Sequence, residues 1–272
     1  MKLLAAFALL IDLRAAIQAA LLPTLYALWL EPLLLLRPTA LSRTFMAYVW
    51  AAFADVVDEG GREVKADLIT PNATGIVLDI GAGHGHTINY LDRSKITKYV
   101  ALEPNTLMHH EIRARATEAG YSETNGTLLI LSCGAEDTES IISSLRVDDQ
   151  PPLCDTIVSV LTLCSVPRPE EVLTTLARDV LKPGGQLLFY EHVLSPRSDV
   201  AWWQRFWTPV WKTAFDGCRL DRPTHLWVQN IKPRDDSVAP ALFWRDESRA
   251  WGKPGEPEEH LFWHQTGRFV KA

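Results

Sequence analysis

A glycine-rich turn stands where a nucleotide-containing ligand could bind. The apolar run 76–80 leads directly into Gly81, Gly83 and Gly85. Glycines at such a turn let the backbone bend tightly and approach a ligand without Cβ clashes. Glu103 closes the next apolar run, roughly 20 residues later, where a carboxylate can accept hydrogen bonds from both hydroxyls of a ribose. The pattern predicts a nucleotide-cofactor site, with Glu103 as its strongest single ligand.

The elements that must position these residues alternate along the chain. Apolar periodicity predicts strands near 76–81, 98–103, 127–132, 155–162 and 185–193, and helices near 86–92, 106–119, 137–145 and 169–181. The helix from Pro169 is expected to end at 181–185, where a proline and paired glycines turn the chain into the next strand. Alternation of this kind predicts a doubly wound, parallel α/β sheet.

Composition narrows the classes of function. With 272 residues, 47% hydrophobic and 22% charged, the chain can form one large domain or a domain with an appendage, and it is not intrinsically disordered. The net charge is -6, and the sequence has no cluster of Lys and Arg that would bind phosphates, so nucleic acid is not a predicted partner. Four cysteines, Cys133, Cys154, Cys164 and Cys218, lack paired metal-ligand spacing. They indicate packing in a reducing compartment, with no zinc.

The first 36 residues differ from the rest of the chain. Residues 3–36 are almost entirely apolar, interrupted by a few charges and prolines that argue against a clean bilayer-spanning helix. The stretch runs past any plausible signal cleavage site, and a nucleotide-dependent enzyme needs cytosolic cofactor, so secretion is the less favoured outcome. Residues 1–42 are predicted to form a one-sided membrane anchor. The alternative is a helical lid that covers an apolar substrate pocket.

Beyond this segment, residues 43–272 are predicted to form the main domain. Apolar residues recur at helical spacing over 43–69, which predicts an amphipathic helix leading into the core. Aromatic residues gather within 196–260, including Trp202, Trp203, Phe206, Trp207 and Trp211. They are interpreted as core or membrane-interface residues, or as the walls of a flat pocket for a lipophilic acceptor.

Three blocks of sequence carry a family resemblance. Asp79 to Gly85, Glu103, and Leu181 to Gly185 followed by an apolar strand resemble the signature blocks of class I methyltransferases that use S-adenosylmethionine (SAM). The segments 161–166, 190–193 and 209–218 resemble the membrane-anchored, methyltransferase-like thiol S-methyltransferases. The ending 264–271 is similar to that family's last strand. Residues 223–257 depart from the family, which bears on substrate identity.

The resemblance implies a Rossmann-like sheet of seven strands with the last strand antiparallel. It also implies that SAM binds at the carboxyl ends of the first, second and fourth strands. Asp79 and the glycines would face the methionine part of SAM, Glu103 the ribose, Ala135 and Glu136 the adenine. The implied cofactor residues are Asp79, Gly81, Ala82, Gly83, Gly85, Glu103, Pro104, Asn105, Ala135, Glu136 and Leu163. For Glu136 and Asp137, helix capping is an alternative role.

Methyl transfer to a thiol, oxygen or nitrogen requires alignment, desolvation and removal of a proton. His192, at the expected carboxyl end of the fifth strand, is the first candidate for the base. Asp216 could orient His192 or act itself, and Glu191 could anchor a loop. Cys164 and Cys218 are interpreted as packing residues rather than reactive groups.

The sequence thus predicts a SAM-dependent methyltransferase for a small lipophilic acceptor, a thiol before a hydroxyl. It is expected on the cytosolic face of a membrane, the endoplasmic reticulum or a lipid droplet. Two alternatives stay open. One is a cyclisation on the same fold without methyl transfer, and the other is a membrane-surface binding protein without catalysis.

Overall fold

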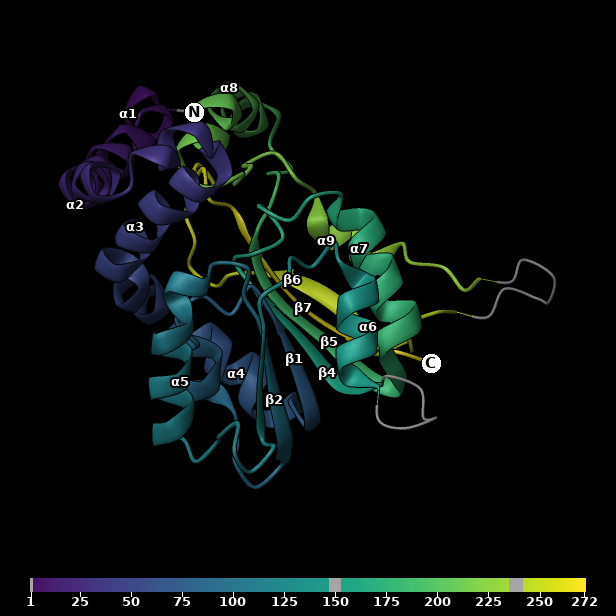
Figure 1. Ribbon diagram of the computed structural model, residues 1–272. Coiled ribbons are helices and arrows are strands. Elements are labelled where there is room, and N and C mark those ends of the chain that lie inside the picture. The colour runs from purple at the N-terminus through teal and green to yellow at the C-terminus, as the bar shows by residue number, and fades with distance from the viewer. Residues whose placement is uncertain (1, 147–152, 235–241) are drawn as a thin grey trace.

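The computed structural model describes residues 2–146, 153–234 and 242–272, and its centre is a seven-stranded sheet (Figure 1). The strands lie in the order β3-β2-β1-β4-β5-β7-β6. Their bounds are β1 Gly75–Ile80, β2 Ile96–Leu102, β3 Leu128–Leu131, β4 Cys154–Val160, β5 Leu181–His192, β6 Arg249–Gly252 and β7 His264–Val270. Strands β1 to β5 pair in parallel, and β7 pairs antiparallel with both β5 and β6. The predicted seven-stranded, Rossmann-like fold with an antiparallel last strand is confirmed.

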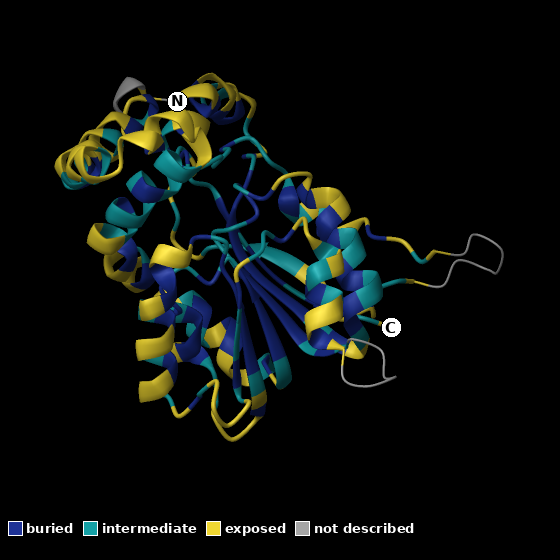
Figure 2. Ribbon diagram, viewed as in Figure 1, coloured by how far each residue is buried: buried dark blue, intermediate teal, exposed yellow. Residues whose placement is uncertain are grey.

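Helices cover both faces of the sheet. Helices α4 Arg62–Asn72 and α5 His109–Glu118 lie on one face (Figure 1). The other face is covered by α6 Thr138–Leu145, α7 Pro169–Thr175 and α9 Thr224–Gln229. Each face has its own apolar core, and the central strands between them are mostly buried, whereas the edge strand β6 is not (Figure 2). Short helical turns η2 His86–Tyr90, η3 Thr106–Met108 and η4 Leu176–Val180 complete the connections. Parallel strands bring their carboxyl ends to one edge, and that edge carries the loops after β1, β2 and β4.

Most predicted elements differ from the structure by a few residues at their ends, and the helix predicted near 86–92 is the short turn η2. Two predictions differ more. The turn expected at 181–185 lies inside β5, where Leu181 pairs with Cys154 and Gln186 with Thr156 across an irregularity in register. Gly184 there has φ +75°, so the glycine serves a bulge rather than a loop. The single helix expected over 43–69 is two helices, α3 Pro38–Gly60 and α4, which break at Gly61. A Cβ at Gly61 would lie 2.8 Å from Cε1 of Tyr190, which explains why only glycine fits the break.

The N-terminal helices pack beside α8 at the same end of the molecule (Figure 1). They are α1 Leu3–Ala6, α2 Leu9–Leu30 and η1 Pro32–Leu36, followed by α3. Of these, α1, α2 and α3 contact α8 Ser198–Ala214. A third apolar cluster joins Leu9 and Ala16 of α2 to Val49 of α3 and Trp211 of α8. The predicted border at 42–43 falls inside α3, which continues through it without a break. Met1 and residues 235–241 of the predicted substrate region lie outside the described residues.

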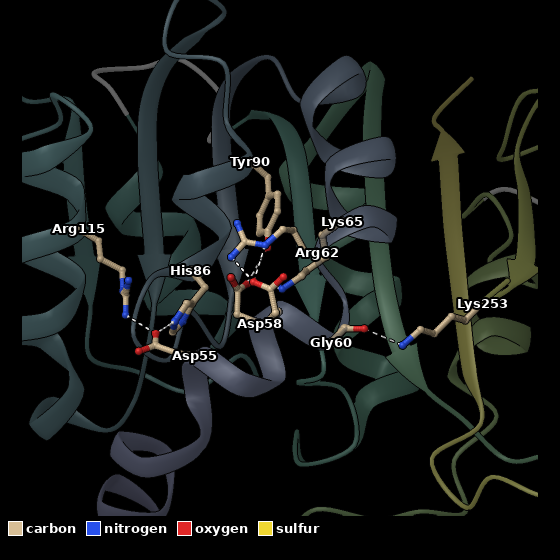
Figure 3. Close-up of polar contacts among 10 residues, drawn as sticks. Asp55, Asp58, Gly60, Arg62, Lys65, His86, Tyr90, Arg115 and Lys253 are labelled. Atoms are coloured by element: carbon tan, nitrogen blue, oxygen red, sulfur yellow. Dashed lines mark hydrogen bonds and ion pairs between the residues drawn. The ribbon is translucent and has the colours of Figure 1, made fainter. Parts of the chain in front are cut away.

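Polar contacts attach α3 to the sheet domain (Figure 3). Asp55 accepts hydrogen bonds from Arg115 at 2.9 Å and pairs with His86 at 2.8 Å. Asp58 forms a buried ion pair with Lys65 of α4 and accepts the Tyr90 hydroxyl at 2.9 Å. A buried charge is tolerated when it is paired and hydrogen-bonded in this way. These contacts hold α3 across the carboxyl edge of the sheet.

The contact between α8 and the N-terminus gives a first prediction. The indole Nε1 of buried Trp207 donates to the carbonyl oxygen of Ala6 at 2.7 Å. Trp207→Phe removes this donor and leaves a buried carbonyl unpaired, which costs about 1–3 kcal/mol. We expect a lower unfolding midpoint and faster amide exchange over residues 2–9, measured by hydrogen–deuterium exchange. Trp202→Phe, at an exposed position of the same helix, is the control, and equal exchange in both variants would contradict the docking.

Candidate functional site

Two neighbouring cavities open at the carboxyl edge of the sheet. The sheet-edge cavity, about 570 Å³, is lined by the loops after β1, β2, β3 and β4 and includes Gly81 and Glu103. The apolar cavity, about 430 Å³, lies beneath α2, α3 and α8 and includes His192 and Trp211. Five side chains line both cavities: Met46, Trp50, Leu161, Ser165 and Phe215. A ligand in one cavity would therefore lie against a ligand in the other.

The glycine turn forms one wall of the sheet-edge cavity. Gly81, Gly83 and Gly85 all have positive φ, between +55° and +80°, as the sequence pattern requires. A Cβ at Gly81 would lie 2.3 Å from Cγ2 of Thr162, and one at Gly83 would lie 2.7 Å from Nε1 of Trp50. Both the conformation and the space at this turn therefore require glycine. The indole N–H of Trp50 is buried without a hydrogen-bond partner among the described residues, so it is available to a ligand.

Glu103 lies at the end of β2 with its carboxylate at the cavity wall. One oxygen accepts the backbone N–H of Gly83 and the other that of Asn105, both at 2.8 Å. Burial raises the pKa of Glu103 to about 7, against the lowering effect of these two hydrogen bonds. The side chain is 6% exposed, so little water competes for its oxygens. The predicted ribose ligand thus lies where the glycine turn and the β2 loop meet.

The structure brings together most, though not all, of the residues predicted to bind the cofactor. Seven of them line the sheet-edge cavity: Gly81, Gly83, Glu103, Pro104, Asn105, Ala135 and Glu136. Four are not among its lining residues: Asp79, Ala82, Gly85 and Leu163. The carboxylate of Asp79 accepts the Tyr99 hydroxyl at 2.5 Å within the buried β1–β2 pair. Leu163 is fully buried in the core, and its backbone N–H donates to Glu191 at 3.2 Å.

The acidic pair after β3 divides into two roles. Asp137 caps α6, because its side chain accepts the backbone N–H of Ser140 at 3.2 Å. Glu136 instead lines the sheet-edge cavity beside Ala135. The capping alternative therefore holds for Asp137, and Glu136 stays in position to contact a ligand.

His192 ends β5 and lines the apolar cavity together with two cysteines. Cys218 donates to the sulfur of Cys164 at 3.4 Å, and its Sγ lies 3.5 Å from Nε2 of His192. The Cys218 thiol, followed by the His192 ring, lowers the pKa of Cys164 well below that of an ordinary thiol. Burial alone would lower the pKa of His192, but the negative charge at Cys164 outweighs it and raises that pKa. The cysteines, interpreted from the sequence as packing residues, form a polar cluster in an apolar wall.

Asp216 and Glu191, the two carboxylates predicted near His192, bond to other partners. Asp216, with φ +42°, lines the sheet-edge cavity and accepts the Ser42 hydroxyl at 3.1 Å. Glu191 is fully buried, and one of its oxygens accepts Ser159 Oγ at 2.7 Å and Thr162 N at 3.0 Å. Glu191 thus anchors the loop after β4, a role that the sequence analysis considered for it.

Sequence reasoning missed the contribution of α3 to the site. Arg43, Met46 and Trp50 of this helix line the sheet-edge cavity, and Asn105 donates its side-chain N–H to the Arg43 carbonyl at 2.8 Å. The helix was predicted only as a lead into the core. A large aromatic at position 50 was the available signal, but nothing in the sequence related it to the glycine turn.

Comparisons with known proteins agree with this geometry. Residues 55–231 match a family model described as a methyltransferase domain. Thiol S-methyltransferase TMT1B of Rattus norvegicus is 51% identical over 118 residues, which are 43% of this chain and 43% of the relative. The Mus musculus protein of the same name is 30% identical over 184 residues, 66% of this chain and 70% of the relative. The matched segment thus spans less than half of the rat relative and more than two thirds of the mouse one.

Solved structures extend the likeness at the level of the fold. A SAM-dependent methyltransferase from Leishmania major is 17% identical with a TM-score of 0.50, covering 86% of this chain and 82% of that chain. A geranyl diphosphate methyltransferase in complex with GPP and sinefungin is 11% identical with a TM-score of 0.51, covering 79% and 77%. At such identities the similarity is one of fold alone.

Proposed function

Since this chain belongs to the class I SAM-dependent methyltransferase family, we propose that it transfers a methyl group to a small lipophilic thiol held in the apolar cavity. The observation that carries this proposal is the contiguity of the two cavities, which share five side chains. An acceptor in the apolar cavity would lie against the donor in the sheet-edge cavity, and proximity of this kind is the main requirement of methyl transfer.

The residues of the sheet-edge cavity fit SAM. Bound SAM supplies an electrophilic methyl group on a positively charged sulfonium. Glu103 would accept the ribose hydroxyls, and the glycine turn leaves room for the methionine part. Ala135 and Glu136 would contact the adenine through a backbone N–H and a carboxylate. The cavity wall carries charges of both signs, with Glu103, Glu136 and Asp216 beside Arg43, Lys212, Arg219 and Arg222. Asp79 and Leu163 would not contact SAM. Asp79 would support the β1–β2 pair, and Leu163 the loop after β4.

The lining of the apolar cavity supports a lipophilic acceptor. Its walls are mainly aromatic and aliphatic, from Val49 and Phe53 of α3, Trp211 and Phe215 of α8, and Phe262 before β7. Its polar groups include the imidazole of His192 and the thiols of Cys164 and Cys218. We propose that the acceptor enters sulfur first and loses its proton at this cluster, with His192 as the base. Asp216 contributes charge near the donor rather than orienting His192.

We further propose that the N-terminal helices attach the enzyme to a membrane surface. Among the described residues, α2 is the one helix long and apolar enough to cross a membrane, yet only 22% of its apolar window is buried. Ile11, Leu22 and Trp29 are each 73% exposed, and Trp202 and Phe206 of neighbouring α8 are also exposed (Figure 2). Exposed apolar surface of this extent is typical of a membrane-contacting face. The helices would act as anchor and lid together, because Asp12 and Ala16 of α2 also line the apolar cavity.

Membrane attachment gives a second prediction. In flotation with zwitterionic phospholipid vesicles, wild-type protein is expected in the vesicle fraction. Ile11→Asp/Leu22→Asp is expected to stay largely in solution, because each large apolar side chain contributes about 1.5–3 kcal/mol when buried. Leu226→Asp, at a 44% exposed position on α9 across the sheet, is the matched control. Equal flotation of the two variants would contradict the assignment of this face.

The raised pKa of Glu103 gives a third prediction, for the pH dependence of SAM binding. A carboxyl with a pKa of about 7 is protonated below pH 7, and only its ionised form accepts both ribose hydroxyls. SAM affinity should therefore fall as the pH falls through 7, by about tenfold between pH 8 and pH 6. Calorimetric titration at a series of pH values measures it. Glu103→Gln should bind weakly with little pH dependence, and an unchanged slope in this variant would exclude Glu103 as the cause.

The direct test of the function is product analysis. Purified protein in phospholipid vesicles is incubated with methyl-labelled SAM and matched pairs of apolar thiols and alcohols of the same carbon skeleton. Mass spectrometry should show the labelled thioether, with little labelled ether from the paired alcohol. Ether as the dominant product would move the acceptor from sulfur to oxygen. Binding of SAM without label in any product would overturn methyl transfer to acceptors of this class.

A further inference from the structure

The cluster of Cys164, His192 and Cys218 has the composition of a metal site. One ligand atom from each residue lies within 4.8 Å of the other two. Cys164 and His192 are buried, and Cys218 is partly buried. Two thiolates and an imidazole are soft and borderline ligands that favour zinc among biological cations.

The distances within the cluster are close to those around a tetrahedral ion. With Zn–S near 2.3 Å and Zn–N near 2.05 Å, tetrahedral angles place two sulfurs about 3.8 Å apart and a sulfur and nitrogen about 3.6 Å apart. The corresponding distances here are 3.4 Å between the sulfurs and 3.5 Å between Cys218 Sγ and His192 Nε2. The third pair, Cys164 Sγ and a ring nitrogen of His192, lies within 4.8 Å. The two sulfurs and the Cys218–His192 pair therefore need to separate by only a few tenths of an ångström to admit the ion.

The backbone around the cluster holds the three ligands in place. The Arg219 N–H donates to the Cys164 carbonyl at 3.0 Å, which joins the two cysteine loops directly. Asp216 and Gly217, both with positive φ, form the turn that directs Cys218 back from the end of α8. Glu191 anchors the loop that carries Cys164. Ligands supported in this way keep their geometry without the ion, as a binding site requires.

We propose that Cys164, His192 and Cys218 bind a zinc ion whose fourth position faces the apolar cavity and takes the acceptor thiol. All three residues line that cavity, so a ligand bound there can reach the open position. Three protein ligands with one open position distinguish catalytic zinc sites from structural ones. This inference rests on the proposed thiol methylation. In it the zinc ion, and not the imidazole of His192, promotes loss of the proton from the acceptor thiol.

The step balances without a redox change. A thiol R–SH that takes the fourth position releases its proton to water and binds as thiolate. A new S–CH3 bond forms from the sulfur lone pair as the methyl–sulfonium bond of the donor breaks. The thioether product carries no negative charge and is a weaker ligand, so it leaves and reopens the position. The ion stays divalent throughout.

The test is cobalt(II) substitution of the whole protein in vesicles, reduced and freed of metal by a chelator. We expect about one equivalent of cobalt with the visible bands of a tetrahedral site and a thiolate-to-metal charge-transfer band. Zinc should displace it. Cys164→Ser and Cys218→Ser should each lose the charge-transfer intensity. Addition of an apolar thiol, but not its alcohol counterpart, should shift the visible bands.

Two controls separate this cluster from other groups. Cys133→Ser should keep the full spectrum, because Cys133 is a free cysteine outside the cluster. His260→Asn should keep it too, since the second group of possible ligands, Glu256, His260 and His264, contains no thiolate. Loss of the charge-transfer band in either control would overturn the assignment.

Failure of the inference and failure of the proposed function give different results. Full thiol methylation by chelator-treated protein, with no cobalt spectrum, would overturn the metal site and leave the proposed function standing. A disulfide between Cys164 and Cys218 in freshly purified protein that persists during turnover would do the same. A cobalt spectrum that no thiol perturbs, with no thioether formed, would overturn the thiol as fourth ligand together with the proposed function.

Discussion

Replacement of Glu103 by alanine is expected to weaken SAM binding by about 10²- to 10⁴-fold, because two hydrogen bonds to a charged group are lost and each contributes about 1.5–3 kcal/mol. The carboxylate also holds the backbone N–H groups of Gly83 and Asn105, so the loss includes some order in both loops. The measurement is the dissociation constant of SAM by calorimetry at pH 8, where the wild-type carboxyl is ionised.

A matched variant distinguishes a lost ligand from a general effect of charge. Glu118→Ala removes a carboxylate from an exposed position of neighbouring α5 and should leave the dissociation constant within about twofold. The thermal midpoint of both proteins without SAM shows whether folding is intact. Binding by Glu103→Ala as tight as by Glu118→Ala would remove Glu103 from the site.

Replacement of His192 by asparagine is expected to lower kcat for an alkyl thiol by about 10²- to 10⁴-fold, because His192 assists ionisation of the thiol, either as the base or as a ligand of the proposed zinc ion. The dissociation constant of SAM should stay within about twofold, because His192 lines the apolar cavity and not the sheet-edge cavity. Single-turnover rates with saturating SAM separate the chemical step from cofactor binding.

The acidity of the acceptor provides the internal check. An aryl thiol already ionised at neutral pH needs little help to lose its proton, so its rate should fall much less in His192→Asn than that of an alkyl thiol. His110→Asn, on the exposed side of α5, should affect neither acceptor. Equal loss for both thiols would mean that His192 shapes the cavity rather than assisting ionisation.

Much of the lining of the sheet-edge cavity could be predicted from the sequence because its signals are local. Gly81, Gly83 and Gly85, which need positive φ, lie within one turn of the chain. Glu103 directly follows the next strand, β2. The carboxyl ends of parallel strands meet at one edge, so sequence order alone places these groups together. The limit of this reasoning is visible at Asp79, which belongs to the same motif. Its side chain accepts Tyr99 inside the sheet, because strand register and not motif membership decides which way a side chain points.

For the helices around the apolar cavity, the sequence predicts that helices form but not where they break or how they pack. Helical spacing predicts a helix at 43–69 but not the break at Gly61, where a Cβ would meet the ring of Tyr190, more than a hundred residues away. The apolar N-terminus predicts an anchor or a lid as alternatives. The packing of α2 against α3 and α8, with its outer side exposed, is compatible with both roles at once.

From the sequence alone, five strands of the sheet and the glycine turn followed by Glu103 could be predicted, because each depends on periodicity or on residues close in the chain. The seven-stranded sheet with its antiparallel last strand followed from the family resemblance. Only the tertiary structure brought Cys164 and Cys218, which are 54 positions apart, to 3.4 Å from each other beside His192. Cysteine spacing reveals a metal site only when the ligands share a loop or a turn. Here three separate elements, the loop after β4, the end of β5 and the turn after α8, each supply one ligand. Whether these three elements come together depends on how the sheet and helices pack, which a local sequence pattern does not reveal.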